Sequence, residues 1–103
     1  MPQVLWDKAA IQDLDNIWDY IGSENHDPIA ADRFIDLICE RCKAYSQQPN
    51  MGTSWPELAP EVCFFVVGVY VVIYRPTGDG IGVARILHGA RDIQAIFQES
   101  HRQ

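Results

Sequence analysis

The sequence predicts an α+β fold in the order β-α-α-β-β-β with a short C-terminal helix, in which a helical hairpin packs on an antiparallel sheet. Three observations lead to this prediction. Residues 62–74 are apolar or aromatic apart from one Gly, and most are the types that suit a pleated sheet. Before them, apolar residues recur every three or four positions in two segments, which is the period of amphipathic helices. A shorter segment with the same period follows at 93–99.

The apolar run at 62–74 is too long for one ordinary strand. We place a break at Val67-Gly68, because Gly in second place suits a tight turn with positive φ. Strands are then expected over 62–66 and 69–75, and the turn-forming segment 76–80 leads to a third strand over 81–88. The region is predicted to be a three-stranded meander.

Both faces of its middle strand are apolar, since Tyr70, Val72 and Tyr74 alternate with Val69, Val71 and Ile73. We therefore expect cover on both faces of the sheet. A chain of this length is short of material for that, so one face is a candidate partner surface.

The remaining elements follow from local signals. A short strand is expected at 3–6, and Asp7 is a candidate N-cap for the first helix. Asp27-Pro28 begins a second helix that runs to about residue 48 and stops at Pro49, and 53–61 is expected to be irregular. The apolar face of the first helix consists of Ile11, Leu14, Ile17, Trp18 and Ile21, and its polar face of Asp13, Asp15, Asn16 and Asp19.

Charge and composition limit the classes of function that this protein can have. The 103 residues are expected to form one domain, 1–103, and carry a net charge of −6 with a pI of about 4.8. A broad basic surface for nucleic acid is therefore absent, and we expect no direct DNA binding. Residues 1–48 hold nine acids against four Lys or Arg, so this half either favours a basic partner or is a solvated face that only aids solubility.

No long apolar run or signal segment is visible, which predicts a cytoplasmic protein without a membrane span. Three cysteines are an odd number for a disulfide framework, and Cys39 and Cys42 lack the further ligands of a zinc site. We expect packing or surface cysteines, no metal and no cofactor. His88 is expected to form a hydrogen bond at its strand end. Arg85, in mid-strand, should pair with Asp92 or an acid of the first helix.

Five segments together resemble the ParE branch of the RelE/ParE toxin superfamily. They are 13–21, Ala30-Ala31, 49–52, 70–75 and, above all, 85–92 with the sequence RILHGARD. The resemblance implies a toxin of a type II toxin–antitoxin module of the plasmid-stabilisation kind. Such a toxin inhibits DNA gyrase without being an enzyme, and a ParD-like antitoxin neutralises it in a hetero-oligomer.

RelE toxins, by contrast, cut mRNA on the ribosome with basic residues and a tyrosine. In our alignment their middle-strand arginine falls at about Val71, their lysine pair falls within 62–65, and their tyrosine falls at Phe97. Only the C-terminal arginine is matched, by Arg91, so the nuclease is the alternative function. Many ParE toxins also have an arginine near the start of the second strand, where this chain has Cys63. An inactive toxin-fold binding module therefore remains open.

The site predictions are of two kinds. The effector candidates are Arg75, Arg85, His88 and Arg91. A disordered antitoxin tail that folds on the hairpin and along the sheet would contact Leu14, Trp18, Phe34, Leu37, Ile38, Val69, Val71 and Ile73. The alternative for this second set is that its members pack the hairpin on the sheet.

Overall fold

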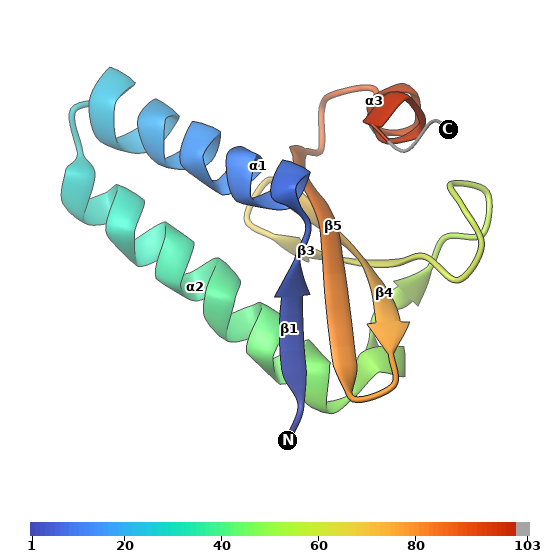
Figure 1. Cartoon of the computed structure of the whole chain (residues 1–103). Coiled ribbons are helices and arrows are strands. Elements are labelled where there is room, and N and C mark those ends of the chain that lie inside the picture. Colours follow the sequence, from blue (N-terminus) through green and yellow to red (C-terminus); the bar gives the residue numbers. More distant parts are fainter. Residues whose placement is uncertain (101–103) are drawn as a thin grey trace.

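The computed structural model describes residues 1–100. Helices α1 and α2 run side by side as a hairpin on one side of the sheet, and α3 lies on the other (Figure 1). The predicted α+β fold is confirmed. In chain order the elements are β1 (Gln3–Trp6), α1 (Lys8–Trp18), a π-helix (Asp19–Glu24), α2 (Pro28–Gln47), a 3₁₀ turn (Pro49–Met51), β2 (Thr53–Ser54), β3 (Cys63–Val67), β4 (Tyr70–Thr77), β5 (Gly80–His88) and α3 (Ile93–Ser100).

The sheet has the strand order β1-β5-β4-β3-β2, and its β3–β4–β5 part is the predicted antiparallel meander. It is not antiparallel throughout, because β1 pairs with β5 in parallel, from Gln3 opposite Gly80 to Trp6 opposite Val83. Tight turns force neighbouring strands of a meander to reverse, whereas the whole helical hairpin separates β1 from the meander and leaves its direction free. The two-residue strand β2 pairs with β3 inside the segment that we expected to be irregular.

The turn between β3 and β4 consists of Gly68 and Val69, one residue later than predicted. Gly68 has φ +61°, so the glycine is the first of the two turn residues and not the second. Val69 lies in the turn instead of beginning the strand, and its side chain is 59% exposed. The β4–β5 pairing also contains an irregularity, since Ile73 pairs with Arg85 and Tyr74 with Val83, which leaves Ala84 as a bulge.

Both faces of the sheet are covered, as the sequence predicts, but this chain covers both of them. On the hairpin side, Ile17 and Ile38 pack with Val72 and Tyr74. On the other side, the segment 55–62 and α3 cover the sheet; the buried residues there are Leu58, Val62, Ile73, Ala84, Leu87, Ile93 and Phe97. The expectation that the chain is short of material was wrong. An irregular segment has no period that reveals which of its side chains face the sheet.

The helix starts agree with the sequence. Ala9 N donates to Asp7 Oδ1 at 3.0 Å, and Ala30 N donates to Asp27 Oδ1 at 3.1 Å, which confirms both N-caps. Two residues of the first helix were placed on the wrong faces: Ile11 is 48% exposed, whereas Asp13 is only 6% exposed. None of the helices within residues 1–100 is both long and apolar enough to span a bilayer. All three cysteines are free, and Cys42 is buried, so the prediction of packing and surface cysteines is confirmed.

Candidate functional site

An apolar groove of about 670 Å³ lies where the end of the helical hairpin meets the β3–β4 turn and the end of β5. We call it the tip groove. Its lining residues are Tyr20, Ile21, Phe34, Gly68, Val69, Tyr70 and His88. Phe34 also lines a smaller hollow of about 330 Å³ on α2, together with Asp27, Ile29, Ala30, Arg33 and Leu37. The two depressions therefore meet at one phenyl ring.

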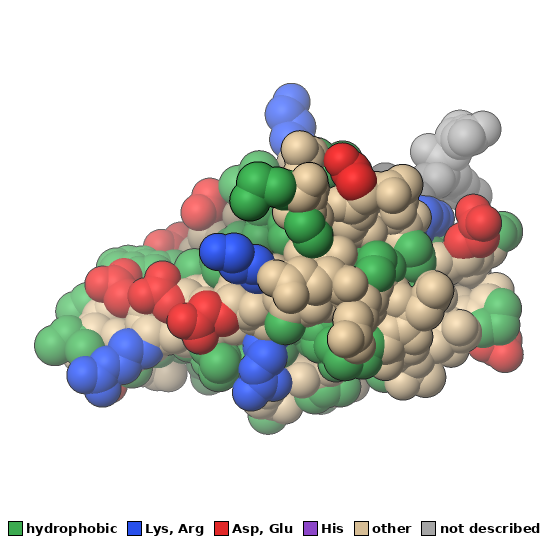
Figure 2. All heavy atoms as spheres, turned by 90° about the horizontal axis from the view of Figure 1, so that it is seen from below, with side chains coloured by type: hydrophobic (Ala, Val, Ile, Leu, Met, Phe, Trp, Pro, Cys, Tyr) green, Lys and Arg blue, Asp and Glu red, His purple; other side chains and the backbone are tan. Residues whose placement is uncertain are grey.

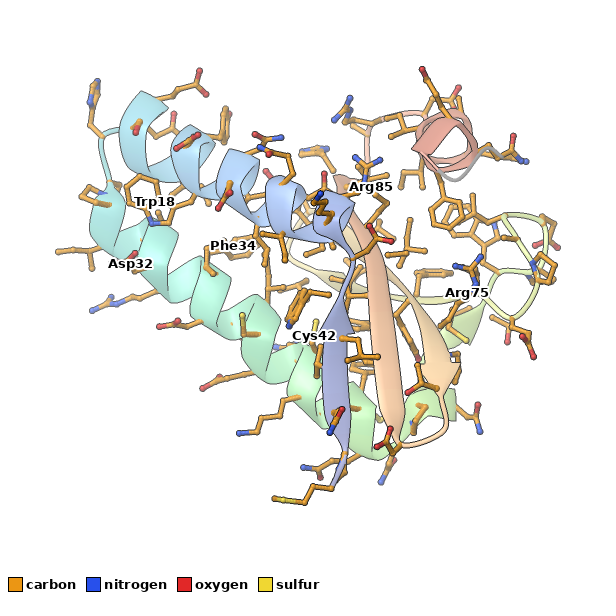
Figure 3. All side chains as sticks on the ribbon, viewed as in Figure 1. Trp18, Asp32, Phe34, Cys42, Arg75 and Arg85 are labelled. Carbon is orange, nitrogen blue, oxygen red and sulfur yellow. The ribbon has the colours of Figure 1, made fainter. Side chains whose placement is uncertain are left out.

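The helical wall of the groove is held by Trp18. Its indole Nε1 donates to Asp32 Oδ1 at 2.8 Å, which ties the end of α1 to α2 (Figure 3). Gly22 packs directly on the indole, because a Cβ at this position would lie only 2.9 Å from Trp18 Cη2. The π-helix begins immediately after Trp18, and its wider turn sets the direction in which Tyr20 and Ile21 project.

The strand wall of the groove is aromatic. The Tyr70 ring lies 5.6 Å from the Phe34 ring and 5.4 Å from the His88 ring, measured between centroids. Burial, and then the neighbouring Tyr20, raise the pKa of Tyr70, so its phenol is uncharged at neutral pH. A Cβ on Gly68 would lie 3.3 Å from Phe34 Cε1, so the turn approaches the ring as closely as packing allows.

His88 forms the predicted hydrogen bond at its strand end. The backbone N–H of Ala90 donates to His88 Nδ1 at 3.0 Å. This bond orients the imidazole, so His88 contributes an aromatic ring to the groove.

The predicted antitoxin contacts divide into three groups. Phe34 and Val69 line the tip groove, and Leu37 lines the adjoining hollow. Leu14, Trp18 and Val71 are half-buried, the last of them on the opposite face of the sheet. Ile38 and Ile73 are 0% exposed, so these two pack the core and cannot form part of a contact surface. Ile38 is on the side of α2 that faces the sheet, and Ile73 is in a central strand that the chain itself covers.

Four residues of the groove were in neither set of site predictions: Tyr20, Ile21, Gly68 and Tyr70. Ile21 was placed on the apolar face of the first helix and Tyr70 on one face of the middle strand, but neither was named as a contact. Tyr20 lies outside the predicted apolar face, and the π-helix is what turns it toward the groove. In the sequence, the one signal that could have identified Tyr20 as a contact is a large aromatic side chain beside the acidic end of the first helix.

The effector candidates do not converge. His88 lies in the tip groove, and Arg91 is exposed in the turn that follows, where its N–H donates to His88 O at 3.0 Å. Arg75 pairs with Gly82, toward the other end of the β4–β5 ladder, and its guanidinium carbon lies 5.9 Å from the Phe97 ring centroid. Figure 3 shows Arg75 well separated from Arg85. A single effector surface containing all four side chains is thus not formed.

Arg85 is bound in a structural pair with Asp13. Arg85 Nε and Nη2 donate to the two Asp13 oxygens at 2.7 and 2.9 Å, and Ile86 N donates to Asp13 Oδ2 at 2.8 Å. The hydrogen bond with Asp13 raises the pKa of Arg85. Strand β1 pairs with β5 only as far as Val83, so no β1 residue is opposite Ile86. The Asp13 carboxylate accepts the hydrogen bond from Ile86 N in its place. The prediction that an acid of the first helix pairs with Arg85 is confirmed, and this engaged side chain is removed from the effector candidates.

Within residues 1–100, no group of three or more His, Cys, Asp or Glu side chains is arranged to hold a metal ion. Arg91 matches one of the nuclease groups, whereas the other positions that align with nuclease groups carry different side chains. Val71 is apolar and half-buried, Phe97 is 1% exposed and Cys63 is 7% exposed.

Comparison with known proteins agrees with this fold. The family pattern described as the ParE toxin of the type II toxin–antitoxin system parDE matches residues 4–93. Toxin RelE2 of Caulobacter vibrioides is 32% identical over 91 residues, which are 88% of this chain and 99% of the relative. A solved structure described as the chromosomal ParDE toxin–antitoxin system from P. aeruginosa has a TM-score of 0.71 and 27% identity, covering 85% of this chain and 96% of that one. With the family pattern extending from the first strand into α3, this chain belongs to the ParE toxin family of type II toxin–antitoxin systems.

Proposed function

We propose that this toxin inhibits DNA gyrase in the cytoplasm by protein–protein contact, and that a ParD-like antitoxin neutralises it by occupying the tip groove. The observation that carries the antitoxin site is a concentration of exposed apolar side chains around one groove. Tyr20 is 54% exposed, Val69 is 59% exposed, and Ile29 beside the adjoining hollow is 65% exposed. Apolar side chains gathered in this way are typical of a surface that a partner covers.

The shape of the surface suits a folded segment of the antitoxin. Tip groove and hollow lie on either side of Phe34, so an amphipathic helix across α2 can place one apolar side chain in each. The hairpin surface is acidic, which favours a segment with basic residues and discriminates against acidic ones.

Variants of the exposed valines test the antitoxin site. Val69→Lys puts a positive charge at the groove, which repels a basic segment, and is expected to weaken antitoxin binding by at least about tenfold, which corresponds to about 1.4 kcal/mol. Val66→Lys is the matched control, because Val66 is 53% exposed on β3 and does not line the groove. Affinities are measured by calorimetry with the antitoxin encoded beside the toxin. Equal affinities of the two variants would place the antitoxin elsewhere.

For the effector we propose Arg91 and the end of β5 as the gyrase-contacting region. Arg91 is exposed, whereas Arg75 is half-buried beside Phe97. Arg91→Ala should therefore reduce inhibition of gyrase supercoiling more than Arg75→Ala does. A larger loss in the Arg75 variant would move the effector to the face of the sheet that carries α3.

The second candidate is a ribosome-dependent mRNA endonuclease, which the name of the RelE2 relative and the retained Arg91 favour. Purified toxin, freed from its antitoxin, should be assayed in parallel for gyrase supercoiling and for mRNA cleavage on ribosomes. Inhibited gyrase with intact mRNA supports the first proposal. Cleaved mRNA with active gyrase supports the second, and failure in both assays leaves an inactive binding module.

A further inference from the structure

The tip groove has an unusual composition for a purely apolar site. Four of its seven lining residues carry aromatic rings, and they come from four elements: Tyr20 of the π-helix, Phe34 of α2, Tyr70 of β4 and His88 of β5. The Tyr70 ring lies 5.6 Å from the Phe34 ring and is inclined to it by 52°, and it lies 5.4 Å from the His88 ring and is inclined to that ring by 77°. The groove therefore contains both faces and edges of aromatic rings, because the Phe34 and His88 rings are steeply inclined to the Tyr70 ring.

The helical hairpin that forms one wall of the groove is rich in acids, whereas Arg91 follows the strand wall at the end of β5. Residues 13–36 contain seven acids and one base, Arg33. Asp13 is engaged by Arg85, and the other six acids are exposed. Figure 2 shows Asp and Glu side chains gathered along the hairpin end of the molecule. No Lys or Arg is among the lining residues of the groove.

These features favour a cation over an apolar anchor. The face of an aromatic ring attracts a guanidinium or ammonium group, and surrounding carboxylates add to this attraction. The groove is open to solvent, so the charged group does not have to lose all of its water. Ile21 and Val69 supply apolar contacts for the methylene chain that precedes the charge.

We propose that the tip groove is an aromatic recognition pocket for an arginine side chain, which the partner inserts among Tyr20, Phe34 and Tyr70. Arginine fits better than lysine because its planar guanidinium stacks on rings while its N–H groups remain directed at water or carboxylates. The inference deepens the proposed antitoxin site and rests on it for the biological partner. Binding of the arginine side chain itself is measurable without that partner.

The probe is N-acetyl-arginine amide, titrated into the isotope-labelled full chain and followed by the backbone amide signals in NMR spectra. Two controls separate the possible causes of binding. N-acetyl-citrulline amide has nearly the same shape without the charge, and N-acetyl-leucine amide is an apolar anchor. We expect the arginine compound to shift the signals of Gly68, Tyr70 and His88. It should bind about two- to fivefold more tightly than either control, which is the size of one exposed cation–π contact.

Tyr20 provides a matched pair of variants, because it is 54% exposed and its replacement leaves the core intact. Tyr20→Phe keeps the ring and should preserve the affinity for the arginine compound. Tyr20→Leu keeps an apolar side chain without the ring and should weaken this affinity by about two- to fivefold. Tyr20→Leu binding as tightly as Tyr20→Phe would overturn the proposed role of the rings.

Other outcomes also decide the matter. Equal binding of the leucine or citrulline compound would show that the groove takes an apolar or neutral anchor, and would overturn the proposal. If, in that case, Val69→Lys still weakened antitoxin binding, the antitoxin site would stand while the arginine pocket failed. Selective arginine binding together with an unchanged affinity of the Val69→Lys variant for the antitoxin would support the pocket and refute the antitoxin site.

Discussion

The Asp13–Arg85 pair offers the sharpest test of how the helical hairpin is fixed to the sheet. The carboxylate accepts three hydrogen bonds, two from Arg85 and one from Ile86 N. The Arg85 and Asp13 side chains are only 12% and 8% exposed. Asp13→Ala deletes the acceptor of all three bonds and leaves the cation in a largely dry site.

Breaking a buried ion pair from one side costs about 3–5 kcal/mol, because the remaining charge stays buried. A domain of this size has a free energy of unfolding of about 5–15 kcal/mol, so the variant should lose a large part of it. At about 4–8 °C per kcal/mol, the melting temperature should fall by more than about 12 °C.

Urea unfolding followed by tryptophan fluorescence measures this loss as a lower midpoint at an unchanged slope. Asp15→Ala is the control, because Asp15 is exposed on the same helix and should change stability by less than about 0.5 kcal/mol. Asp13→Leu with Arg85→Met should cost less than the sum of its single changes, since neither charge then remains unpaired. A loss below about 1 kcal/mol for Asp13→Ala would refute the reasoning.

Three further predictions concern the turn, a buried hydroxyl and alkaline pH. Gly68→Ala should cost about 1–3 kcal/mol, because φ is +61° and Phe34 lies close, whereas Gly78→Ala, with no atom within 4 Å of its Cβ, should be nearly neutral in the same urea assay. Tyr74→Phe should cost about 1–3 kcal/mol, since its hydroxyl donates to Pro49 O and accepts from Gly52 N; wild-type stability in urea would contradict this. Burial raises the pKa of the Cys42 thiol from 9.0 to about 12. The folded state therefore keeps a proton that the unfolded state loses, and stability should fall between pH 9.0 and about 12 with a slope of about 1.4 kcal/mol per pH unit from this group. Cys42→Ala should remove this part of the slope in urea titrations at several pH values.

Much of the fold follows from local signals. Asp7 and Asp27 mark the helix starts because a cap needs only the next two or three residues, and both caps are present. The meander follows from β-branched residues interrupted by turn formers, and the ends of its strands lie within two residues of the predicted ones.

The errors concern residues whose position depends on distant partners. Asp13 looks like a solvent-facing acid on its helix, and only Arg85, far along the chain, explains why it is buried. The parallel direction of β1 depends on the strand edge that β5 offers, and the cover over Ile73 depends on a segment without regular structure.

The sequence by itself therefore determined the element order, the helix caps, the apolar meander and the resemblance to the ParE family, because each is written in neighbouring residues or in ordered motifs. Only the tertiary structure decided which side chains share the tip groove. Tyr20, Phe34, Tyr70 and His88 meet there because a π-helix, a two-residue turn and the pairing of Tyr70 with His88 bring them together. Convergence of this kind arises from packing between elements, and no local pattern along the chain encodes it.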